Sequence, residues 1–317
     1  MEKIEVLRQM VSVARYYYLY RYPRSKIADI LGVSRQYVSK LLDKAIEEGL
    51  VDIKIIDPFE LDSQLGKKLC KLTGLQDIVI VPSPFNKSEA IKRNIGMTGA
   101  AYLSDKIKPG SIIGIGWGAT LNYLVQNFQK QRIENTKVVP LLGGRGNLEP
   151  RFQVNSLVTL LAEKISAEPF LLYAPVILDS KSAQKEILSS VAEVVDYWDK
   201  LDVVLVGIGS LQEDESSNPF NPVYIPIEER SAMKRKRAVG DMCLRYFNIE
   251  GEEVTSENYY KICIGLDQLK KAPLVIGLAG NMSKLQAIQG VIAGKYINVL
   301  ITDETVAQEL LLLYSKK

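Results

Sequence analysis

Histidine is absent from this sequence of 317 residues. It is the commonest general base in enzymes, the usual activator of a nucleophile and the commonest metal ligand. A chain of this length can lack histidine by chance, but the absence makes most enzyme mechanisms and metal sites harder to build. We therefore expect no catalytic residues, no metal and no cofactor.

Cysteine is scarce, and long apolar runs are missing. Cys70, Cys243 and Cys263 are odd in number and far apart, and the sequence shows no CxxC motif and no secretory signal. This pattern favours a reducing compartment over a disulfide framework. Because no apolar run reaches about 18 residues, nothing is expected to span a membrane. The sequence thus predicts a cytoplasmic protein without a membrane partner.

Length and composition favour two globular domains. The chain is 47% hydrophobic and 24% charged, and its 317 residues exceed the size at which one core stays efficient. The net charge of +3 is too small to identify a nucleic-acid binder. Its distribution is more informative, because residues 15–44 hold only two acidic side chains against seven basic ones: Arg15, Arg21, Arg24, Lys26, Arg35, Lys40 and Lys44.

The N-terminal region has the pattern of a helix-turn-helix. Apolar residues over 5–20 lie near helical spacing and predict a first helix, whose three tyrosines at 16–18 are expected to pack in the core or at a dimer contact. Ala28, Gly32 and Val38 match the motif's spacing: a small residue where helices cross, a glycine in the turn and a branched residue behind it. Ser34 can cap the second helix, which buries its apolar side.

The outer face of that second helix carries the candidate DNA contacts. Arginine and glutamine can read guanine and adenine edges, whereas lysine and serine are suited to hold phosphates. The alternative is a solvated charged helix. The basic excess favours DNA binding, as does the alternating stretch 50–57, which predicts a strand or wing. The DNA-binding candidates are Ser34, Arg35, Gln36, Tyr37, Ser39 and Lys40.

The rest of the chain predicts an α/β domain. The first domain spans residues 1–57, since Asp57 precedes a proline and so disfavours helix. Residues 58–74 predict a linker helix. Over 75–317 buried strands alternate with amphipathic helices, which is typical of a parallel sheet, and the polar stretch from Gln212 predicts a loop or lid. The expected strands are 77–81, 111–117, 137–142, 202–209, 274–280 and 297–303, and the expected helices are 88–107, 119–130, 153–166, 283–293 and the C-terminal segment.

Ligands of open α/β sheets bind beyond the carboxyl ends of the strands, so the loops there form the candidate effector site. One loop connects a buried strand to a helix and places backbone amides at the positive helix end, which suits phosphate or another anion. It is not a dinucleotide fingerprint, because the third glycine is missing. A simple tight turn is the alternative. The candidates in this loop are Gly116, Trp117, Gly118, Ala119 and Thr120.

Other loops add further candidates. Arg145 follows paired glycines and is either an anion clamp or a solvated side chain. Asp241 is either a carboxylate that holds sugar hydroxyls or a plain turn residue. Lys284 lies in the first turn of a predicted helix, an unfavourable place for a cation unless an anion is near. These candidates are Gly143, Gly144, Arg145, Gly207, Gly209, Ser210, Asp241, Gly280 and Lys284.

Over nearly its full length the chain resembles the SorC-type sugar-responsive transcriptional regulators. The resemblance rests, in family order, on IADILGVSRQYVSKLL, IGIGWGATL, RFQVNSL, YWDKLDVVLVGIGS, AVGDMCLRYFNIEG and GKYINVLITDE. It implies a helix-turn-helix followed by an α/β effector domain similar to glucosamine-6-phosphate deaminase and ribose-5-phosphate isomerase. It also implies a homotetramer that regulates a carbohydrate operon by binding operator DNA and a phosphorylated sugar or sugar alcohol.

The resemblance adds Asn155 to the implied pocket. Some relatives have a cationic residue directly before the paired glycines, where this chain has Leu142 and carries Arg145 after them. Two other functions stay open. One is a sugar-phosphate isomerase or deaminase fused to a DNA-binding module, with Asp241 and Lys284 as acid and base. The other is a DNA-binding protein whose C-terminal domain only oligomerises.

Overall fold

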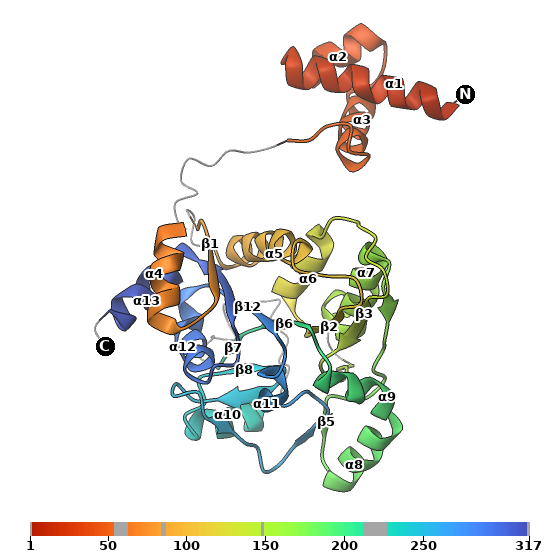
Figure 1. Cartoon of the computed structure of the whole chain (residues 1–317). Helices are drawn as coiled ribbons and strands as arrows, with labels where there is room; N and C mark the ends of the chain where they lie inside the picture. Colours follow the sequence, from red (N-terminus) through yellow and green to blue (C-terminus); the bar gives the residue numbers. More distant parts are fainter. Residues whose placement is uncertain (1, 54–62, 84–86, 147–148, 212–226, 316–317) are drawn as a thin grey trace. The chain divides into compact units, whose positions relative to one another are not determined.

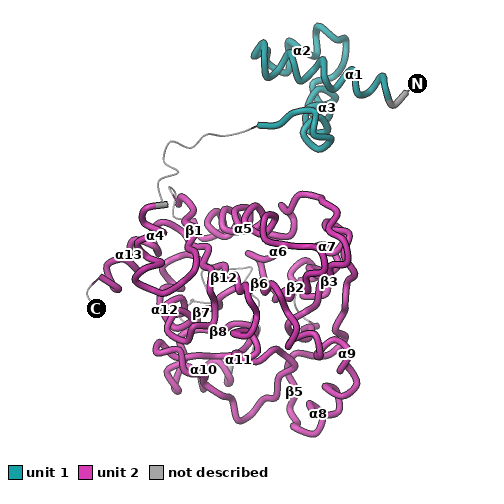
Figure 2. The backbone as a smooth tube through the Cα atoms, in the orientation of Figure 1, with its two compact units in different colours: residues 1–60 teal, residues 61–317 magenta. Residues whose placement is uncertain are grey.

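The chain folds into two compact units. The computed structural model describes residues 2–53, 63–83, 87–146, 149–211 and 227–315 (Figure 1). The smaller unit spans residues 1–60 and the larger one residues 61–317, each around its own apolar core (Figure 2). The expected loop that starts at Gln212 lies outside the described residues.

The smaller unit is a short helical bundle. It contains α1 (Glu2–Ala14), α2 (Arg24–Leu31) and α3 (Arg35–Glu47), and both α1 and α2 contact α3. The two later helices, joined by a tight turn, confirm the predicted helix-turn-helix. The core of the unit is made of Met10, Val13, Ala14, Ile27, Ala28, Val38, Leu41, Leu42 and Ala45.

The turn of this motif depends on one glycine and one cap. Gly32 has φ +63°, and its amide donates to the Ala28 carbonyl, which ends α2. The left-handed conformation is costly for any residue with a Cβ atom, so glycine is the favoured residue here. The Ser34 hydroxyl accepts a hydrogen bond from the Tyr37 amide at 3.1 Å and begins α3. Both roles agree with the sequence prediction.

The first helix is shorter than its periodicity predicts. It ends at Ala14 instead of continuing to residue 20, and Arg15–Leu19 forms a π-helical turn. Tyr16, Tyr17 and Tyr18 are all half-buried against the core of the unit, which confirms their packing role. Successive residues of an α-helix do not share a face, whereas the wider π-turn changes the helical register at this point.

The strand or wing expected over 50–57 does not form at residues 50–53. Ile53 is 53% exposed, so the alternating pattern buries no apolar face at this point. Residues 54–57 lie outside the described residues.

The larger unit is built on a seven-stranded sheet in which every pair of neighbours is parallel. All five residues of its strand Val299–Asp303 are buried, so helices cover both faces there. In spatial order the strands are β1 (Asp77–Val81), β13 (Val299–Asp303), β12 (Leu274–Leu278), β6 (Val203–Gly207), β2 (Ile112–Ile115), β3 (Lys137–Pro140) and β4 (Glu168–Pro169).

The helices of this unit follow the predicted α/β alternation. The segment expected as a linker helix is α4, and its Leu69 is fully buried in the core of the larger unit. The predicted linker helix began at residue 58, and residues 58–62 lie outside the described residues. The other predicted bounds differ by up to three residues, mainly because helix ends are set by capping and tertiary contacts. The helices are α4 (Ser63–Thr73), α5 (Ser88–Ser104), α6 (Ala119–Asn127), α7 (Val154–Ile165), α12 (Leu285–Ala293) and α13 (Glu304–Tyr314).

A second, antiparallel sheet follows the end of β6. Strands of two or three residues have no measurable periodicity, so the sequence indicated only the strand beside Asp241. The sheet order is β10 (Glu253–Val254), β9 (Arg245–Phe247), β8 (Gly240–Met242) and β7 (Gly209–Ser210). The structure also contains α8 (Lys181–Ser190), α9 (Ala192–Val195), α10 (Ile227–Arg235), α11 (Leu266–Leu269) and the paired strands β5 (Ile177–Leu178) and β11 (Tyr260–Lys261).

We expect Gly32→Ala to destabilise the smaller unit by about 1 kcal/mol, because the added Cβ atom strains the left-handed turn. No atom lies near enough to clash with that Cβ, so strain is the only cost. Hydrogen exchange of the α3 amides in the full chain should become faster. Gly32→Asn is the matched control and should lose less, since asparagine tolerates this conformation. Unchanged exchange in Gly32→Ala would contradict the assigned role of the turn.

Candidate functional site

The first two turns of α3 present a polar, basic surface. Arg35, Gln36 and Lys40 are exposed, and Ser39 is half-buried. The first turn carries no acidic residue, so its positive helix end is not neutralised. All six predicted DNA contacts are therefore exposed or partly exposed near the capped helix end: Ser34, Arg35, Gln36, Tyr37, Ser39 and Lys40.

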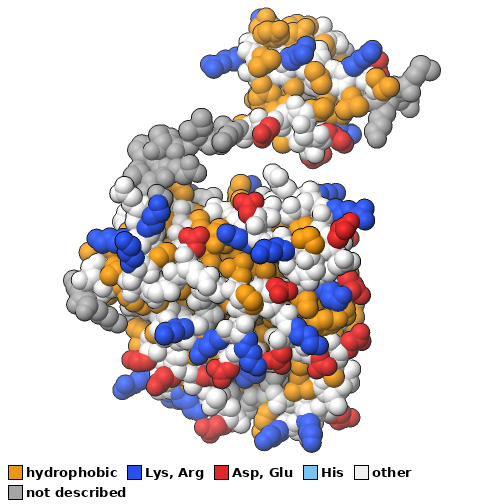
Figure 3. Space-filling view, viewed as in Figure 1, with side chains coloured by type: hydrophobic (Ala, Val, Ile, Leu, Met, Phe, Trp, Pro, Cys, Tyr) orange, Lys and Arg blue, Asp and Glu red, His pale blue; other side chains and the backbone are white. Residues whose placement is uncertain are grey.

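Tyr37 has a second role that the sequence did not indicate. Its hydroxyl donates to the Gln9 side chain of α1 at 3.0 Å, and 37% of the residue remains exposed. The ring thus fixes α3 against α1 while its outer edge stays accessible. Figure 3 shows lysine and arginine side chains beside hydrophobic ones on the visible face of this unit.

In the larger unit the strand order reverses between β2 and β6. From β2 the chain adds β3 and β4 on one side, whereas from β6 it adds β12 and β13 on the other. A crevice forms where neighbouring connections leave in opposite directions, and ligands of open α/β sheets bind there. The loops after β2 and β6 carry the predicted candidates Gly116–Thr120 and Gly207–Ser210.

The loop after β2 leads into the free amide end of α6. Gly118 has φ +117° and precedes the helix, which is why a residue with a side chain is disfavoured there. The Gly116 amide donates to the Leu205 carbonyl at 2.9 Å, so it is not available to a ligand. The amides of Ala119, Thr120 and Leu121 have no intrahelical acceptor, and no acceptor for them lies in the described part of the chain.

Lys284 and Ser210 connect the loops after β6 and β12. The Lys284 ammonium group donates to the Ile208 carbonyl at 2.8 Å. The Ser210 hydroxyl donates to the Ser283 carbonyl at 2.7 Å. Both side chains are half-buried, so a cation stands at the strand ends beside the switch point. Lys284 lies in the 3₁₀ turn that precedes α12.

Asp241 lies in β8 directly opposite Gly209 of β7. A Cβ atom at Gly209 would lie 2.1 Å from the Asp241 carboxylate, so glycine is required for this close approach. Asp241 Oδ2 also accepts from the Leu244 amide at 3.1 Å and thereby holds the hairpin turn. Asp241 therefore stabilises the turn, and its side chain is half-buried beside the β6 loop.

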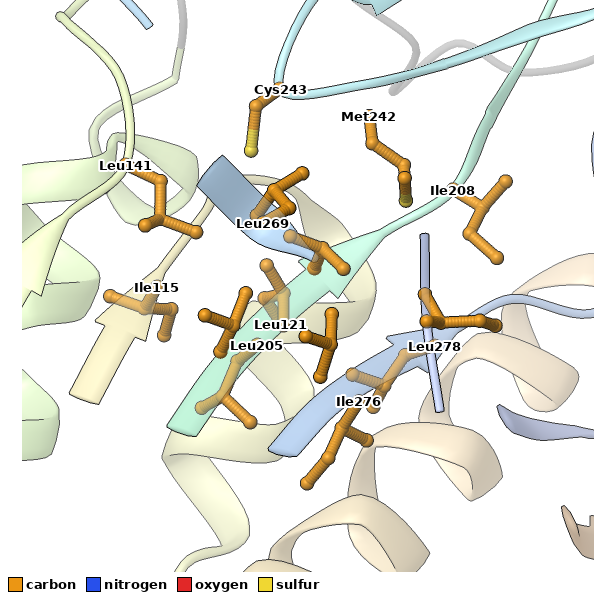
Figure 4. Close-up of a cluster of buried hydrophobic side chains, with 14 of the residues drawn as sticks. Ile115, Leu121, Leu141, Leu205, Ile208, Met242, Cys243, Leu269, Ile276 and Leu278 are labelled. Carbon is orange, nitrogen blue, oxygen red and sulfur yellow. The ribbon is translucent and has the colours of Figure 1, made fainter. Parts of the chain in front are cut away.

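The hairpin turn after Asp241 has an unusual backbone. Cys243 and Leu244 both have positive φ, 50° and 62°, although neither is glycine. Tertiary packing holds this strained turn, because both side chains are buried. Figure 4 shows the Cys243 thiol pointing toward the apolar cluster that contains Ile115 and Leu205. Burial raises the pKa of the Cys243 thiol well above its ordinary value, so it is a neutral packing group.

Two predicted amides are not available for anion binding. The Gly143 amide donates to the Ile262 carbonyl at 2.9 Å, and the Gly144 amide donates to the Ala174 carbonyl at 2.8 Å. Neither amide is therefore free to bind an anion, and the placement of Gly143 and Gly144 in the effector site stays a prediction. Two backbone segments remote in sequence occupy these donors, and residue patterns alone do not reveal this.

Four further candidates make contacts within the fold. The Arg145 amide is held by the Gln153 side chain at 3.3 Å. Asn155 donates to the Leu172 carbonyl at 3.2 Å and accepts from the Leu172 amide at 3.1 Å, so it anchors that strand-like segment. Gly280 is buried against Asp303, where a Cβ atom would approach a carboxylate oxygen to 2.5 Å. The half-buried Trp117 packs against the core.

These features define a class of protein. One unit carries a helix-turn-helix with an exposed basic surface on its second helix, and the other carries a parallel sheet with a switch point, the place where open α/β sheets bind small molecules. Such a combination is that of a ligand-responsive transcription regulator. None of the described helices is long and apolar enough to cross a bilayer.

Comparison with known proteins gives the family. Residues 57–312 match the family model described as "Putative sugar-binding domain". The sorbitol operon regulator of Klebsiella pneumoniae is 32% identical over 316 residues, covering 98% of this chain and 100% of the relative. The deoxyribonucleoside regulator of Bacillus subtilis (strain 168) is 31% identical over 303 residues, covering 95% and 96%. The chain belongs to the SorC-type family of sugar-responsive transcriptional regulators.

The solved structures agree with this assignment. The crystal structure of the full-length sorbitol operon regulator from Klebsiella pneumoniae superposes with a TM-score of 0.78 at 32% identity, covering 96% of this chain and 98% of that one. A probable sor operon regulator from Shigella flexneri gives a TM-score of 0.72 at 33% identity over 79% of this chain and 99% of that one. These relatives are regulators of transcription, not enzymes.

We expect Asn155→Asp to lower the free energy of unfolding of the larger unit by about 1–3 kcal/mol, because the Leu172 carbonyl then faces an oxygen instead of a donor. Denaturant unfolding of the full chain measures this loss. Thr159→Val is the control, since Thr159 is exposed and bonds only the Asn155 carbonyl of its own helix. An unchanged denaturation midpoint in Asn155→Asp would contradict the anchoring role of Asn155.

Proposed function

We propose that this regulator is cytoplasmic, that α3 binds operator DNA, and that a phosphorylated sugar or sugar alcohol bound at the switch point controls it. The observation that carries the proposal combines two features: three amides at the start of α6 that the described residues leave unpaired, and the Lys284 ammonium group near the end of β6. Both attract an anion at the place where open α/β sheets bind ligands.

The chemistry of the site favours a phosphate ester over a neutral sugar. Helix amides and an ammonium group stabilise a dianionic phosphate through hydrogen bonds and charge. The Asp241 carboxylate can accept hydrogen bonds from hydroxyl groups but repels phosphate, so it is suited to the sugar end of the ligand. The relatives named for sorbitol and deoxyribonucleosides support an effector of sugar type.

The surface of α3 supports the proposed DNA contacts. A recognition helix enters the major groove with its N-terminal residues against the base edges. Arg35 and Gln36 occupy that end and can read guanine and adenine, whereas Ser34 and Lys40 are suited to contact phosphates. The Tyr37 ring edge lies between these two sets.

We further propose a homotetramer that binds a two-fold operator. A dimer is the minimum that places two recognition helices in successive major grooves, and the family resemblance extends this to a dimer of dimers. Effector binding then closes the strand-end loops and shifts the population toward an arrangement that no longer matches the operator. Linkage requires that operator DNA weaken effector binding by the same factor.

The DNA contacts are tested by a pair of variants. Lys40→Ala should weaken binding to all sequences alike and reduce the slope of log affinity against log salt by about one, since it removes a phosphate contact. Gln36→Ala should instead change base preference at one position by about 1–3 kcal/mol. Binding titrations against a randomised operator library at two salt concentrations separate these effects, and the reverse pattern would refute the assignment.

The effector site is tested by a thermal-shift screen of sugars, sugar alcohols and their phosphate esters. A phosphate ester at about 100 times its Kd should raise Tm by roughly 5–10 °C. Lys284→Ala and Asp241→Ala should each abolish the shift, whereas Lys181→Ala, an exposed lysine on α8, should leave it unchanged.

The same screen decides between the alternatives. A compound that raises Tm should also change the affinity for operator DNA. Equal operator affinity with and without a saturating concentration of that compound would contradict the switching mechanism. Absence of any shift would favour a domain that only oligomerises. Turnover of a sugar phosphate by the purified protein would establish the isomerase or deaminase alternative.

A further inference from the structure

A buried carboxylate lies at the carboxyl end of β13, outside the groups proposed to contact the effector. Asp303 is the last residue of this strand, and it is completely buried. Among the described residues no lysine or arginine forms an ion pair with it. Because burying an unpaired charge is costly, hydrogen bonds must compensate it. The donors that surround Asp303 therefore show what the carboxylate holds in place.

The two oxygens of Asp303 hold different elements. Oδ1 accepts from the Thr305 amide at 3.1 Å and from the Val306 amide at 3.3 Å, which caps the start of α13. Oδ2 accepts from the Asn281 amide at 2.6 Å, in the loop after β12. The cap uses Oδ1 alone, so Oδ2 serves the loop.

The backbone of this loop is strained. Asn281 has φ 82° and ψ 142°, a conformation that glycine tolerates far better than a residue with a Cβ atom. Such strain persists only where the surrounding structure holds it, and it gathers at functional sites. The preceding Gly280 has no room for a side chain, since a Cβ atom there would lie 2.5 Å from Asp303 Oδ2. One buried oxygen atom therefore fixes two successive residues of the loop.

Asn281 builds the turn that carries Lys284. Its carbonyl accepts from the Lys284 amide at 2.9 Å, and its side-chain oxygen accepts from the Ser283 amide at 3.3 Å. The Lys284 ammonium group then reaches the Ile208 carbonyl in the loop after β6, at 2.8 Å. The position of this cation at the strand ends therefore depends on the loop that the Asp303 carboxylate holds.

We propose that Asp303 is a positioning residue for anion binding, which acts through Asn281 to fix the Lys284 ammonium group at the strand ends. The inference rests on the proposed function, in which Lys284 contacts the phosphate of the effector. Asp303 acts without touching that phosphate, because its carboxylate is buried and bonded to backbone amides. A cation that is already fixed binds an anion more tightly than a mobile one, since less conformational freedom is lost on binding.

Asp303→Asn separates the two roles of the carboxylate. Asparagine caps helices as well as aspartate does, so its oxygen can still cap α13. Its amide group then faces the Asn281 amide, donor against donor, and the opposite orientation would lose two acceptors instead of one. Competitive acetylation of the full chain, read by mass spectrometry, measures the accessibility of each lysine. We expect Lys284 to be acetylated about tenfold faster in the variant, because a hydrogen bond to a charged group no longer holds its loop.

Lys164 is an internal reference in the same experiment. It is half-buried too, and its ammonium group donates to the Gln126 and Phe128 carbonyls, each at 2.7 Å. Its acetylation rate should stay unchanged in Asp303→Asn. An equal rise at both lysines would show a general loosening of the unit, and an unchanged rate at Lys284 would show that its position does not depend on Asp303. Either result would overturn the proposal.

Phosphate binding supplies the second measurement, with inorganic phosphate as the probe in a phosphorus NMR titration of the full chain. We expect Asp303→Asn to raise the phosphate Kd about tenfold, since the cation loses one charge-assisted hydrogen bond from its support. Asp267→Asn is the charge-matched control, because its side chain is 95% exposed on α11. It should change neither phosphate binding nor the acetylation of Lys284.

The role of Asp303 and the effector site itself can fail separately. If Lys284→Ala weakens phosphate binding but Asp303→Asn does not, the effector site stands and the positioning role of Asp303 is overturned. If Lys284→Ala has no effect on phosphate binding, the effector site itself is refuted. Asp303 then has no anion site to serve, whatever the acetylation shows, and the proposal falls with it.

Discussion

The structure depends on where the backbone amides at the carboxyl ends of the parallel strands find their acceptors. The Gly116 amide donates to the neighbouring strand. The Gly143 amide donates to the Ile262 carbonyl, more than a hundred residues later in the chain, and the Gly144 amide donates to the Ala174 carbonyl, about thirty residues later. The first turn of α6 keeps amides that the described part of the chain does not satisfy. We propose that these amides form part of an anion site at the switch point, made from residues that have no charge.

The hairpin of β8 and β9 links the loop after β6 to a buried ion pair of the larger unit. Asp241 and Tyr246 are cross-strand partners. Asp241 closes on Gly209 near the end of β6, while the Tyr246 ring contacts the Lys261 ammonium group, which pairs with Glu229. The strained turn at Cys243 and Leu244 joins these strands and is held by burial. One small element thus positions both Asp241 of the proposed effector site and the ring that packs on the buried Lys261.

Regular elements were well predicted where their pattern is long. The strand Asp77–Val81 has the predicted bounds, and the helix predicted over 88–107 ends three residues early at Ser104. The prediction was weaker where tertiary contacts override a local pattern. Examples are the π-turn after Ala14, the missing strand at 50–53 and the short antiparallel strands around Asp241. The short strands pair with partners outside their own segment, so no periodicity within the segment predicts them.

The sequence by itself determined the helix-turn-helix, the parallel α/β alternation and the loops in which we propose the effector site. These follow from local rules: apolar periodicity, a glycine that tolerates positive φ and a serine that caps a helix. The tertiary structure alone decided which of those loops kept free donors. It also decided that Lys261 is buried between Glu229 and the Tyr246 ring. The physical reason is that each buried polar group is satisfied or left open by partners that are distant along the chain.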